Sequence, residues 1–346
     1  MVPSIRTRIG ALVRDWPRFE LAVHGVGRFR SHPNPWLLVR NRNERIHSDG
    51  RGVACEWQWT SDLHIARVFP WAGRRLMRRA FSAWPVVFRD QPERRGRTSV
   101  SFVIGHRGLD RLPNLLTTLR SIAGQTVPVE CIVVEQSFHP QIESMLPQWV
   151  RYLYTPAPGP DHPYSRARAF NVGARAATGE VLVLHDNDLI VPASYAAEAI
   201  ERIDEGFAFA DLKRFIFYLS AEATSHLVSS GRAADVAPVA VTQNAQGGSV
   251  VAAKDAYFAI GGFDEDFVGW GGEDNDFWDR TSVGGRAYHF GYLPFLHLHH
   301  EPQSGKIAGV SGGIERYRAI QSIDPRERVA RLLARRQGEA SAPATD

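Results

Sequence analysis

From residue 98 onward, the chain alternates between apolar runs and segments with helical periodicity. Three apolar runs, each ending in polar residues, predict buried strands: residues 98–107, 129–137 and 180–188. Two intervening segments place apolar side chains at helical spacing: residues 112–125 and 164–179. This alternation predicts an α/β fold, in which a parallel sheet carries helices on its faces.

Each predicted strand ends in polar side chains, at the positions where ligands bind in sheets of this kind. The three ends are His106–Arg107, Glu135–Gln136 and Asp186–Asn187–Asp188. Because the carboxyl ends of parallel strands meet at one edge, we expect these side chains to gather there.

The pattern continues beyond residue 190 with weaker signals. Residues 191–203 are expected to form a helix, and residues 207–219 a strand or helix of the same core. A flexible loop at 243–249 leads into a strand-like segment at 250–263. The Arg-rich segment that begins at 324 predicts a helix followed by a disordered tail.

Residues 1–97 differ from the rest of the chain in composition. They hold six of the nine tryptophans, and alternation at residues 54–59 predicts short strands. Residues 71–83 predict a basic amphipathic helix, which we expect to pack in a small aromatic cap rather than lie on a membrane. A polar linker at 89–97 predicts a boundary before the α/β domain.

Composition places the chain among folded globular proteins. It is 44% hydrophobic and 23% charged, which is ordinary for a folded soluble protein. Its 346 residues are enough for one large domain or two moderate ones. No apolar run approaches a membrane span and the N-terminus lacks a signal-peptide core, so the sequence predicts a cytoplasmic protein. The cysteines, Cys55 and Cys131, provide no disulfide framework or metal spacing and are expected to be buried thiols.

Charge is distributed unevenly along the chain. Residues 1–97 carry 19 Arg and no Lys against 8 acids, whereas the remainder carries 22 basic and 29 acidic residues. The basic segment suits anionic lipid headgroups, a lipid-linked substrate or the acidic body of the chain itself. Peripheral association with the inner face of the membrane is therefore one hypothesis. Nucleic acid is not an expected partner, since no recognised binding motif accompanies the charge.

An Asp-x-Asp pair, Asp186 and Asp188, follows the third predicted strand and can present two carboxylates to a divalent cation that also binds a diphosphate. Hard cations such as Mg²⁺ and Mn²⁺ prefer oxygen ligands. Three histidines within four residues late in the chain, His297, His299 and His300, add a candidate imidazole ligand, which suits Mn²⁺ better than Mg²⁺. In an extended segment, His297 and His299 would face one way and His300 the other.

Three arginines and one glutamate are candidates for nucleotide contacts. Guanidinium groups bind phosphate bidentately, which makes Arg107, Arg166 and Arg168 candidates. Arg166 and Arg168 would lie about 200° apart on a helix, so we expect them not to point the same way. Glu135 can accept from a base N–H or a ribose hydroxyl, or it can be a helix cap or surface acid.

Residues 261–279 carry the strongest signal for sugar chemistry, GGFDEDFVGWGGEDNDFWD. Trp270 lies among glycines that permit a sharp turn, and acids surround it. An indole face stacks on a pyranose, and a carboxylate can take a proton from a hydroxyl. A calcium-binding EF-hand is excluded, because the fifth and twelfth positions from Asp264 are valine and asparagine. The acids at 264–266 are interpreted as turn-forming surface residues.

With these residues assembled, the chain resembles the GT-A glycosyltransferases. Residues 98–190 resemble the nucleotide-sugar half of family 2 enzymes through SFVIGHRGLDRLPNLLTTLRSIAGQ, VVEQS and LVLHDND. Residues 243–305 resemble the galactosyltransferase C-terminal module shared by beta-1,4-galactosyltransferases and bacterial chondroitin polymerases. The most specific elements are GWGGEDND, close to WGGED, and YSRARAFNVG, similar to NRAKLLNVG. The resemblance implies a Rossmann-like, nucleotide-sugar-binding mixed sheet over residues 98–323, between an N-terminal region of unknown role and a tail at 324–346.

The resemblance also implies roles for single residues around the acidic turn. Asp274 matches the catalytic base, and Glu273 beside it matches an acceptor-binding acid, with Gly272 at the same turn. Trp270 matches the tryptophan that contacts both sugars. Asp188 matches the metal-binding acid of the D-x-D motif.

Further implied roles concern the nucleotide and the metal. The candidates for nucleotide-sugar contacts are His106, Arg107, Glu135, Arg166, Arg168, Asp186, Asn187 and Trp270. His299 best matches the metal histidine, because chondroitin polymerases have a similar H-x-E-P run, and His297 is the fallback. The implied cofactor is Mn²⁺ or Mg²⁺. At Gly105–His106 the family often has Pro and an aromatic or Thr, so base stacking is not implied there.

The implied reaction is inverting transfer of a hexose (Gal, GalNAc or Glc type) from a UDP-sugar to a saccharide or lipid-linked saccharide, in cell-surface polysaccharide or glycoconjugate synthesis. Related retaining N-acetylgalactosaminyltransferases carry Glu-Asn where this chain has Glu273-Asp274, so the aspartate favours inversion. Two other classes remain as alternatives. A sugar-nucleotide pyrophosphorylase needs a Gly-rich phosphate loop, where this chain has only GHRGL, and a carbohydrate-binding module would not need D-x-D.

Overall fold

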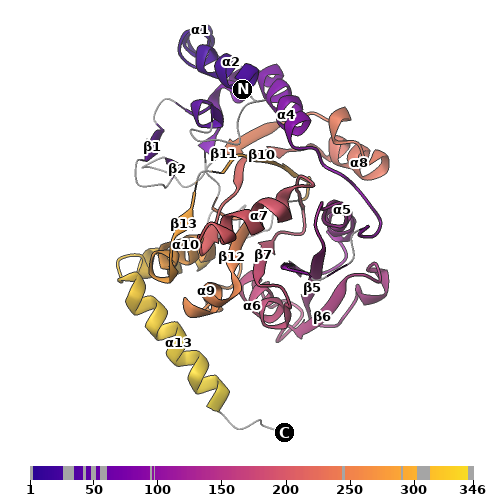
Figure 1. Ribbon diagram of the computed structural model, residues 1–346, viewed down its shortest axis with the longest axis vertical. Helices are drawn as coiled ribbons and strands as arrows, with labels where there is room; N and C mark the ends of the chain where they lie inside the picture. Colours follow the sequence, from indigo (N-terminus) through magenta and orange to yellow (C-terminus); the bar gives the residue numbers. More distant parts are fainter. Residues whose placement is uncertain are drawn as a thin grey trace.

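The computed structural model arranges the chain around two β-sheets flanked by helices (Figure 1). The described residues are 3–25, 35–41, 44–47, 52–54, 61–93, 96, 98–243, 246–289, 291–301 and 312–341. Cys55 and most of the predicted strand segment at 54–59 lie outside them.

Seven strands form the larger sheet, in the order β13-β9-β12-β7-β4-β5-β6. They are β13 (Ala287–Tyr288), β9 (Phe209–Ala210), β12 (Ser249–Ala253), β7 (Val181–His185), β4 (Val100–His106), β5 (Val129–Ser137) and β6 (Arg151–Pro156). Strands β7, β4, β5 and β6 pair in parallel, whereas β12 pairs antiparallel to both β7 and β9. The predicted mixed sheet is therefore confirmed.

Helices cover both faces of this sheet, which explains why its strands are continuous apolar runs. In β4, Phe102 and Ile104 face the core under α5 (Leu112–Ala123) and α7 (Tyr195–Asp204). Val103 faces the other way, into the core formed with α6 (Arg166–Ala176), α9 (Lys254–Ala259) and α10 (Glu273–Gly284). Successive strand residues point to opposite faces, so burying both faces favours apolar residues at nearly every position.

Five strands form the second sheet, in the order β3-β11-β10-β14-β8. They are β3 (Ser61–Asp62), β11 (Ala240–Gln243), β10 (Lys213–Tyr218), β14 (Leu293–His297) and β8 (Leu189–Ile190). Strands β10 and β14 pair in parallel, and β14 pairs antiparallel with β8. Because β8 follows directly after Asp188, this sheet brings the end of β14 to the Asp-x-Asp pair.

The N-terminal region supplies strand β3, which pairs antiparallel with β11. Its other elements are α1 (Ile5–Arg14), α2 (Trp16–Gly25), η1 (Pro35–Leu38), β1 (Arg45–His47), β2 (Gly52–Ala54), α3 (His64–Val68) and α4 (Pro70–Ala83). Helix α4 is the predicted amphipathic helix and buries Leu76, Met77 and Phe81. Trp36 and Trp84 belong to the same apolar core as Phe102 of β4, so this region is built into the fold.

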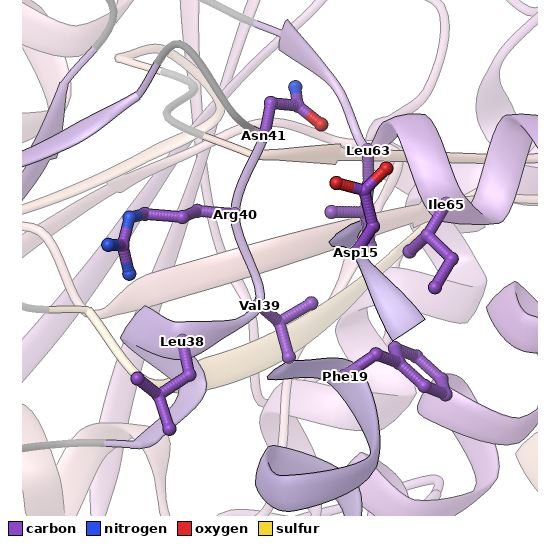
Figure 2. Close-up of a pocket in the computed structure, with 8 residues that line it drawn as sticks. All are labelled: Asp15, Phe19, Leu38, Val39, Arg40, Asn41, Leu63 and Ile65. Atoms are coloured by element: carbon purple, nitrogen blue, oxygen red, sulfur yellow. The ribbon is translucent and has the colours of Figure 1, made fainter. Parts of the chain in front are cut away.

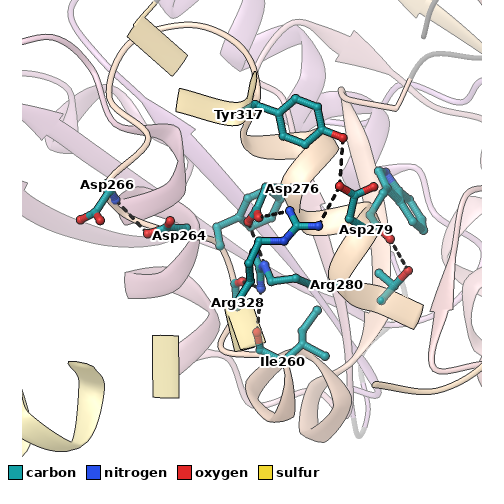
Figure 3. A network of polar contacts seen from close by, with 12 residues as sticks. Ile260, Asp264, Asp266, Asp276, Asp279, Arg280, Tyr317 and Arg328 are labelled. Carbon is teal, nitrogen blue, oxygen red and sulfur yellow. Dashed lines mark hydrogen bonds and ion pairs between the residues drawn. The ribbon is translucent and has the colours of Figure 1, made fainter. Parts of the chain in front are cut away.

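The C-terminal segment that the sequence predicts as helix and then disorder is helical from Pro325 to Ser341 (α13), after α12 (Gly312–Ile320). Figure 3 shows how α13 is tied to α10. Arg328 of α13 donates to Asp276 over 2.7 Å and to Asp279 over 3.0 Å, and Arg280 also pairs with Asp276, over 2.8 Å. Helix α13 is therefore tied to the fold through Arg328, near its N-terminal end.

The acids interpreted as surface turn formers have a further role. Asp264 and Asp266 each pair with Arg316 of α12 and with Arg335 of α13. Asp264 is buried, and burial alone would raise the pKa of its carboxyl, but the two arginines hold that pKa below its usual value. The turn at residues 264–266 therefore anchors both C-terminal helices.

The segments at 207–219 and 250–263, for which the sequence signal is weak, differ in how well they match the expectation. Residues 207–219 form strands β9 and β10, whereas the strand-like segment at 250–263 continues β12 only to Ala253 and then turns into α9. The remaining short elements are η2 (Glu143–Met145), α8 (Ala221–Ser230) and η3 (Ala233–Asp235). Among the described residues, no helix is both long and apolar enough to cross a membrane.

Candidate active site

The polar ends of β4 and β7 meet at one edge of the larger sheet, as predicted. Nδ2 of Asn187 lies 2.7 Å from Nδ1 of His106, and Nε2 of His106 lies 2.7 Å from the Gly108 carbonyl oxygen. The carbonyl can only accept, so Nε2 carries the proton and Nδ1 accepts from the amide. Burial lowers the pKa of His106, which keeps this imidazole neutral. His106 and Asn187 thus hold the Asp-x-Asp segment in place from within the protein.

Asp188 lies in a cluster with two histidines. Its carboxylate is 3.2 Å from Nε2 of His300 and 3.9 Å from Nε2 of His297, and one ligand atom from each residue falls within 4.8 Å of the others. Burial opposes ionisation of Asp188, but the neighbouring imidazoles hold the pKa of its carboxyl well below the usual value. An ionised carboxylate with two imidazoles is a donor set that suits Mn²⁺.

One of the two histidines, His297, is oriented as metal ligands commonly are. Nδ1 of His297 lies 2.8 Å from the Leu298 carbonyl oxygen. Nδ1 of His300 lies between two groups, 2.8 Å from the Glu301 carbonyl oxygen and 3.0 Å from Nη2 of Arg111. A ring whose Nδ1–H donates to a backbone carbonyl presents Nε2 to a cation. Tyr218 also stacks on His297, with ring centroids 4.3 Å apart.

The expected metal ligand His299 lies outside this cluster, whereas the fallback His297 lies within it together with His300. Strand β14 ends at His297, so the alternation expected for an extended segment does not continue to residue 300. The backbone N–H of His299 instead donates to Thr224 Oγ1 over 2.8 Å. Arg111, which no sequence motif singles out, also contacts the cluster: Nη1 lies 3.3 Å from Oδ2 of Asp188 and Nη2 lies 3.0 Å from Nδ1 of His300.

Arg166 connects the Asp-x-Asp pair to the acidic turn. It begins α6, where Ser165 caps the helix by accepting from the backbone N–H of Arg168. Its Nε lies 2.6 Å from Asp186, and its Nη1 lies 2.7 Å from Asp274 and 3.4 Å from Glu273. Its guanidinium carbon also lies 4.6 Å from the Phe170 ring centroid. One guanidinium thus holds three carboxylates from two distant segments.

Two buried polar atoms at this junction have no hydrogen-bond partner among the described residues: Nη2 of Arg166 and Oε2 of Glu273. An unpaired buried donor or acceptor is costly, and such atoms are commonly satisfied by a ligand or water. The junction therefore offers one donor and one acceptor to a bound molecule.

Glu273 and Asp274 begin helix α10 after a turn of glycines. Gly271 and Gly272 have φ of 90° and 87°, which side chains with a Cβ rarely adopt. A Cβ on Gly247 would lie 2.3 Å from Oδ2 of Asp274, so the carboxylate packs where only glycine leaves room. Trp270, on the same turn, is 42% exposed.

Burial and like charge shift the acids of this junction. Burial, with Asp274 nearby, raises the pKa of Glu273 to about 7. Burial also raises the pKa of Asp186 to about 6, although Arg166 opposes the shift. Three acids share a single arginine, so the junction carries excess negative charge when all of them are ionised.

The remaining predicted nucleotide contacts are engaged within the protein. The Glu135 carboxylate accepts from Ser137 Oγ and Tyr152 OH, over 2.6 and 2.7 Å, and from the backbone N–H groups of Gln141 and Ile142. It therefore holds the loop after β5 in place. Arg107 donates to backbone carbonyls at residues 160 and 162.

Arg168 lies on the far side of α6 from Arg166. Its side chain is exposed, and Nε donates to Thr155 Oγ1 over 3.2 Å. The helical spacing of the two arginines predicts this divergence, and the structure assigns Arg166 to the junction.

One further hollow lies on the N-terminal region, away from these acids in sequence (Figure 2). It is lined by Asp15, Phe19, Leu38, Val39, Arg40, Asn41, Leu63 and Ile65. Its volume of about 10 Å³ accommodates at most a water molecule. It is not a site for a sugar or a nucleotide.

Two family comparisons match adjoining parts of this chain. The family described as glycosyl transferase family 2 matches residues 109–228, which include Arg166, Asp186 and Asp188. The family described as the N-terminal domain of galactosyltransferase matches residues 235–300, which include Glu273 and Asp274. No curated protein matches the sequence.

Two solved structures resemble this chain at low identity. S. aureus TarS 1-349 in complex with UDP is 13% identical with a TM-score of 0.41, over 58% of this chain and 61% of that chain. The mannosyltransferase PcManGT from Pyrobaculum calidifontis, in complex with GDP-Man and Mn²⁺, is 16% identical with a TM-score of 0.40, over 80% of this chain and 84% of that chain.

The family matches and the mixed sheet identify the chain as a GT-A glycosyltransferase. Within that class it combines a family 2 domain with a galactosyltransferase-type segment, and Arg166 bridges the two.

Proposed function

We propose that this glycosyltransferase moves a hexose from a UDP-sugar to a saccharide hydroxyl, with inversion at the anomeric carbon and with a divalent cation, preferably Mn²⁺. The observation that carries the proposal is the junction at Arg166. There the Asp-x-Asp pair and the Glu273–Asp274 pair share one guanidinium, with a buried donor and a buried acceptor left over. A donor and an acceptor sugar could be brought together at such a junction.

The donor side of the proposal rests on the cluster of Asp188, His297 and His300. These residues would hold the cation, whose chemistry is to neutralise the charge that develops on the leaving diphosphate. Nη2 of Arg166 supplies a cationic donor toward the same diphosphate. Asp186 orients Arg166 through its 2.6 Å contact with Nε.

The acceptor side rests on Asp274. As general base, its carboxylate takes the proton of the acceptor hydroxyl while that oxygen forms a bond to C1 and the bond from C1 to the UDP oxygen breaks. Arg166 holds Oδ1 of Asp274, which fixes the orientation of the carboxylate. A general base is useful only in its ionised form, so this role requires Asp274 to be deprotonated when the acceptor binds.

Glu273 and Trp270 would position the acceptor. Oε2 of Glu273 has no partner among the described residues and can accept from a second sugar hydroxyl. The exposed indole of Trp270 offers a flat apolar surface to a pyranose ring. Gly272 brings the backbone of the turn close to the same place. The donor would be of the Gal, GalNAc or Glc type, and the acceptor a free or lipid-linked saccharide.

The test is a screen of UDP-sugars with Mn²⁺ and saccharide acceptors, followed by NMR of the product. We expect transfer from a UDP-hexose, with a product of inverted anomeric configuration. A product that retains the donor configuration would overturn the role of Asp274 and support a retaining transferase. Formation of a nucleotide sugar from a nucleoside triphosphate and a sugar phosphate would instead support a pyrophosphorylase.

A further inference from the structure

Helix α1 exposes an apolar stripe along its length. Ile5, Ile9, Leu12 and Val13 are 77%, 57%, 46% and 70% exposed. At roughly 100° per residue, the four side chains fall within an arc of about 100° on one face of the helix. Ala11, which is buried, lies on the roughly opposite side, where α1 contacts the fold. The stripe is therefore the outward face of a docked helix.

Arginines border this stripe on both sides. On the same helical wheel, Arg6 falls beside Val13 and Arg8 falls beside Leu12, and both arginine side chains are exposed. The helix contains three arginines and no acid. An apolar stripe between two cationic borders is complementary to a surface that is anionic outside and apolar beneath.

Helices α2 and α4 also expose large apolar side chains. Leu21 of α2 and Trp71 of α4 are 68% and 49% exposed. Trp71 packs against Trp16, with ring centroids 4.8 Å apart, so its ring is held in place at the surface. Figure 1 places α1 and α2 at the end of the molecule opposite the C-terminus, where a flat partner could approach them.

We propose that α1 docks the enzyme on an anionic lipid bilayer. The helix would lie in the plane of the interface, with its apolar stripe at the acyl-chain boundary and Arg6 and Arg8 on lipid phosphates. Two copies of the chain would bring the same arginines together if they paired through this stripe, which disfavours self-association. An acidic protein partner would pair with the arginines but has no need of the apolar stripe. An anionic bilayer accommodates both.

The test uses the full-length protein in flotation with two kinds of vesicle, phosphatidylcholine alone and phosphatidylcholine with phosphatidylglycerol. We expect the protein to float with the anionic vesicles and not with the neutral ones. Ile9→Ser/Leu12→Ser and Arg6→Gln/Arg8→Gln should each lower the partition coefficient at least about tenfold. All four side chains are exposed, so the variants should fold as the parent does.

Matched controls change the same residue types elsewhere. Val239→Ser/Val283→Ser removes two exposed apolar side chains outside α1, and Arg326→Gln/Arg331→Gln removes two exposed arginines of α13. Both controls should float as the parent does. Equal losses in the controls would show unspecific adsorption and overturn the assignment to α1.

Two other outcomes would also overturn the proposal. If the parent protein does not float with anionic vesicles, α1 is not a lipid-docking helix. If sedimentation shows a dimer that Ile9→Ser/Leu12→Ser converts to a monomer, the stripe binds a second copy instead of lipid. Neither outcome depends on whether the enzyme transfers a hexose, since no step of the assay uses a nucleotide sugar.

Discussion

Nη1 of Arg166 lies 2.7 Å from Oδ1 of Asp274, although the two residues are 108 positions apart in the chain. The same guanidinium reaches Asp186 at the end of β7, so a single side chain joins the two halves of the proposed site.

Replacing the proposed base tests the acceptor half of the site. Asp274→Asn should lower the turnover number by at least about 10²-fold, because an amide cannot take the acceptor proton. Binding of UDP and Mn²⁺, measured by calorimetry, should stay within about twofold, since the metal cluster is formed by other residues. Asp255→Asn, an exposed acid of α9, is the matched control. Near-normal turnover of Asp274→Asn would refute the assignment.

Substitution of His299 and His300 tests which histidine binds the metal, since the sequence predicts His299 and the structure places His300 beside Asp188. His300→Ala should weaken Mn²⁺ binding at least about tenfold, because Nε2 of His300 is one of the three clustered ligand atoms. His299→Ala should leave Mn²⁺ affinity unchanged, since His299 lies outside the cluster and its backbone N–H and carbonyl bond Thr224 and Asn114. Titration of Mn²⁺ followed by electron paramagnetic resonance measures both. The reverse order of effects would restore His299 as the ligand.

Arg166 should contribute strongly to stability as well as to binding. Arg166→Met leaves three carboxylates without their shared cation, and we expect the free energy of unfolding to fall by about 3 kcal/mol. Arg168→Met on the exposed side of the same helix should change it by less than about 0.5 kcal/mol. Urea denaturation monitored by tryptophan fluorescence provides the measurement. Equal effects of the two variants would show that Arg166 acts only through helix α6.

The raised pKa of Glu273 predicts how stability depends on pH. The folded state binds this proton more tightly than the unfolded state, whose glutamate has a pKa near 4.5, while the folded value is about 7. The contribution of Glu273 is therefore fully present below about pH 4.5 and is lost as pH rises toward about 7. Glu273→Gln should flatten that decline by up to about 3 kcal/mol. Unfolding curves across this range test it, and an unchanged slope in the variant would contradict it.

The contact between α13 and α10 predicts that the C-terminal helix stabilises the fold. Arg328→Met leaves Asp276 and Asp279 with fewer cations and should lower the free energy of unfolding by about 3 kcal/mol. Arg331→Met removes only an exposed pair with Glu327 and should cost less than about 1 kcal/mol. Thermal or urea unfolding measures the free energy of unfolding of both variants. Similar losses in the two would show that the contact of Arg328 with α10 contributes little to stability.

Several features of the fold follow from the sequence alone. Strands β4, β5 and β7 can be predicted from the sequence because both faces of their sheet are covered by helices. Their segments are therefore almost continuously apolar. Helices α5, α6 and α7 can be predicted from the helical spacing of their apolar residues, which is a local pattern in the sequence. The Asp-x-Asp pair and the glycine turn around Trp270 are likewise local patterns.

Only the tertiary structure decides which polar side chains meet. His300 replaces His299 at Asp188 because the chain leaves strand β14 after His297, and alternation no longer sets the direction of the side chains. Glu135 follows a strand at the correct edge, but it is taken up by its own loop, which no spacing rule reveals. The joining of Arg166 to Asp186 and Asp274 likewise depends on contacts 20 and 108 residues apart. The sequence determines local elements and the chemistry available, because those depend on near neighbours, whereas packing decides which groups share a proton, a cation or an arginine.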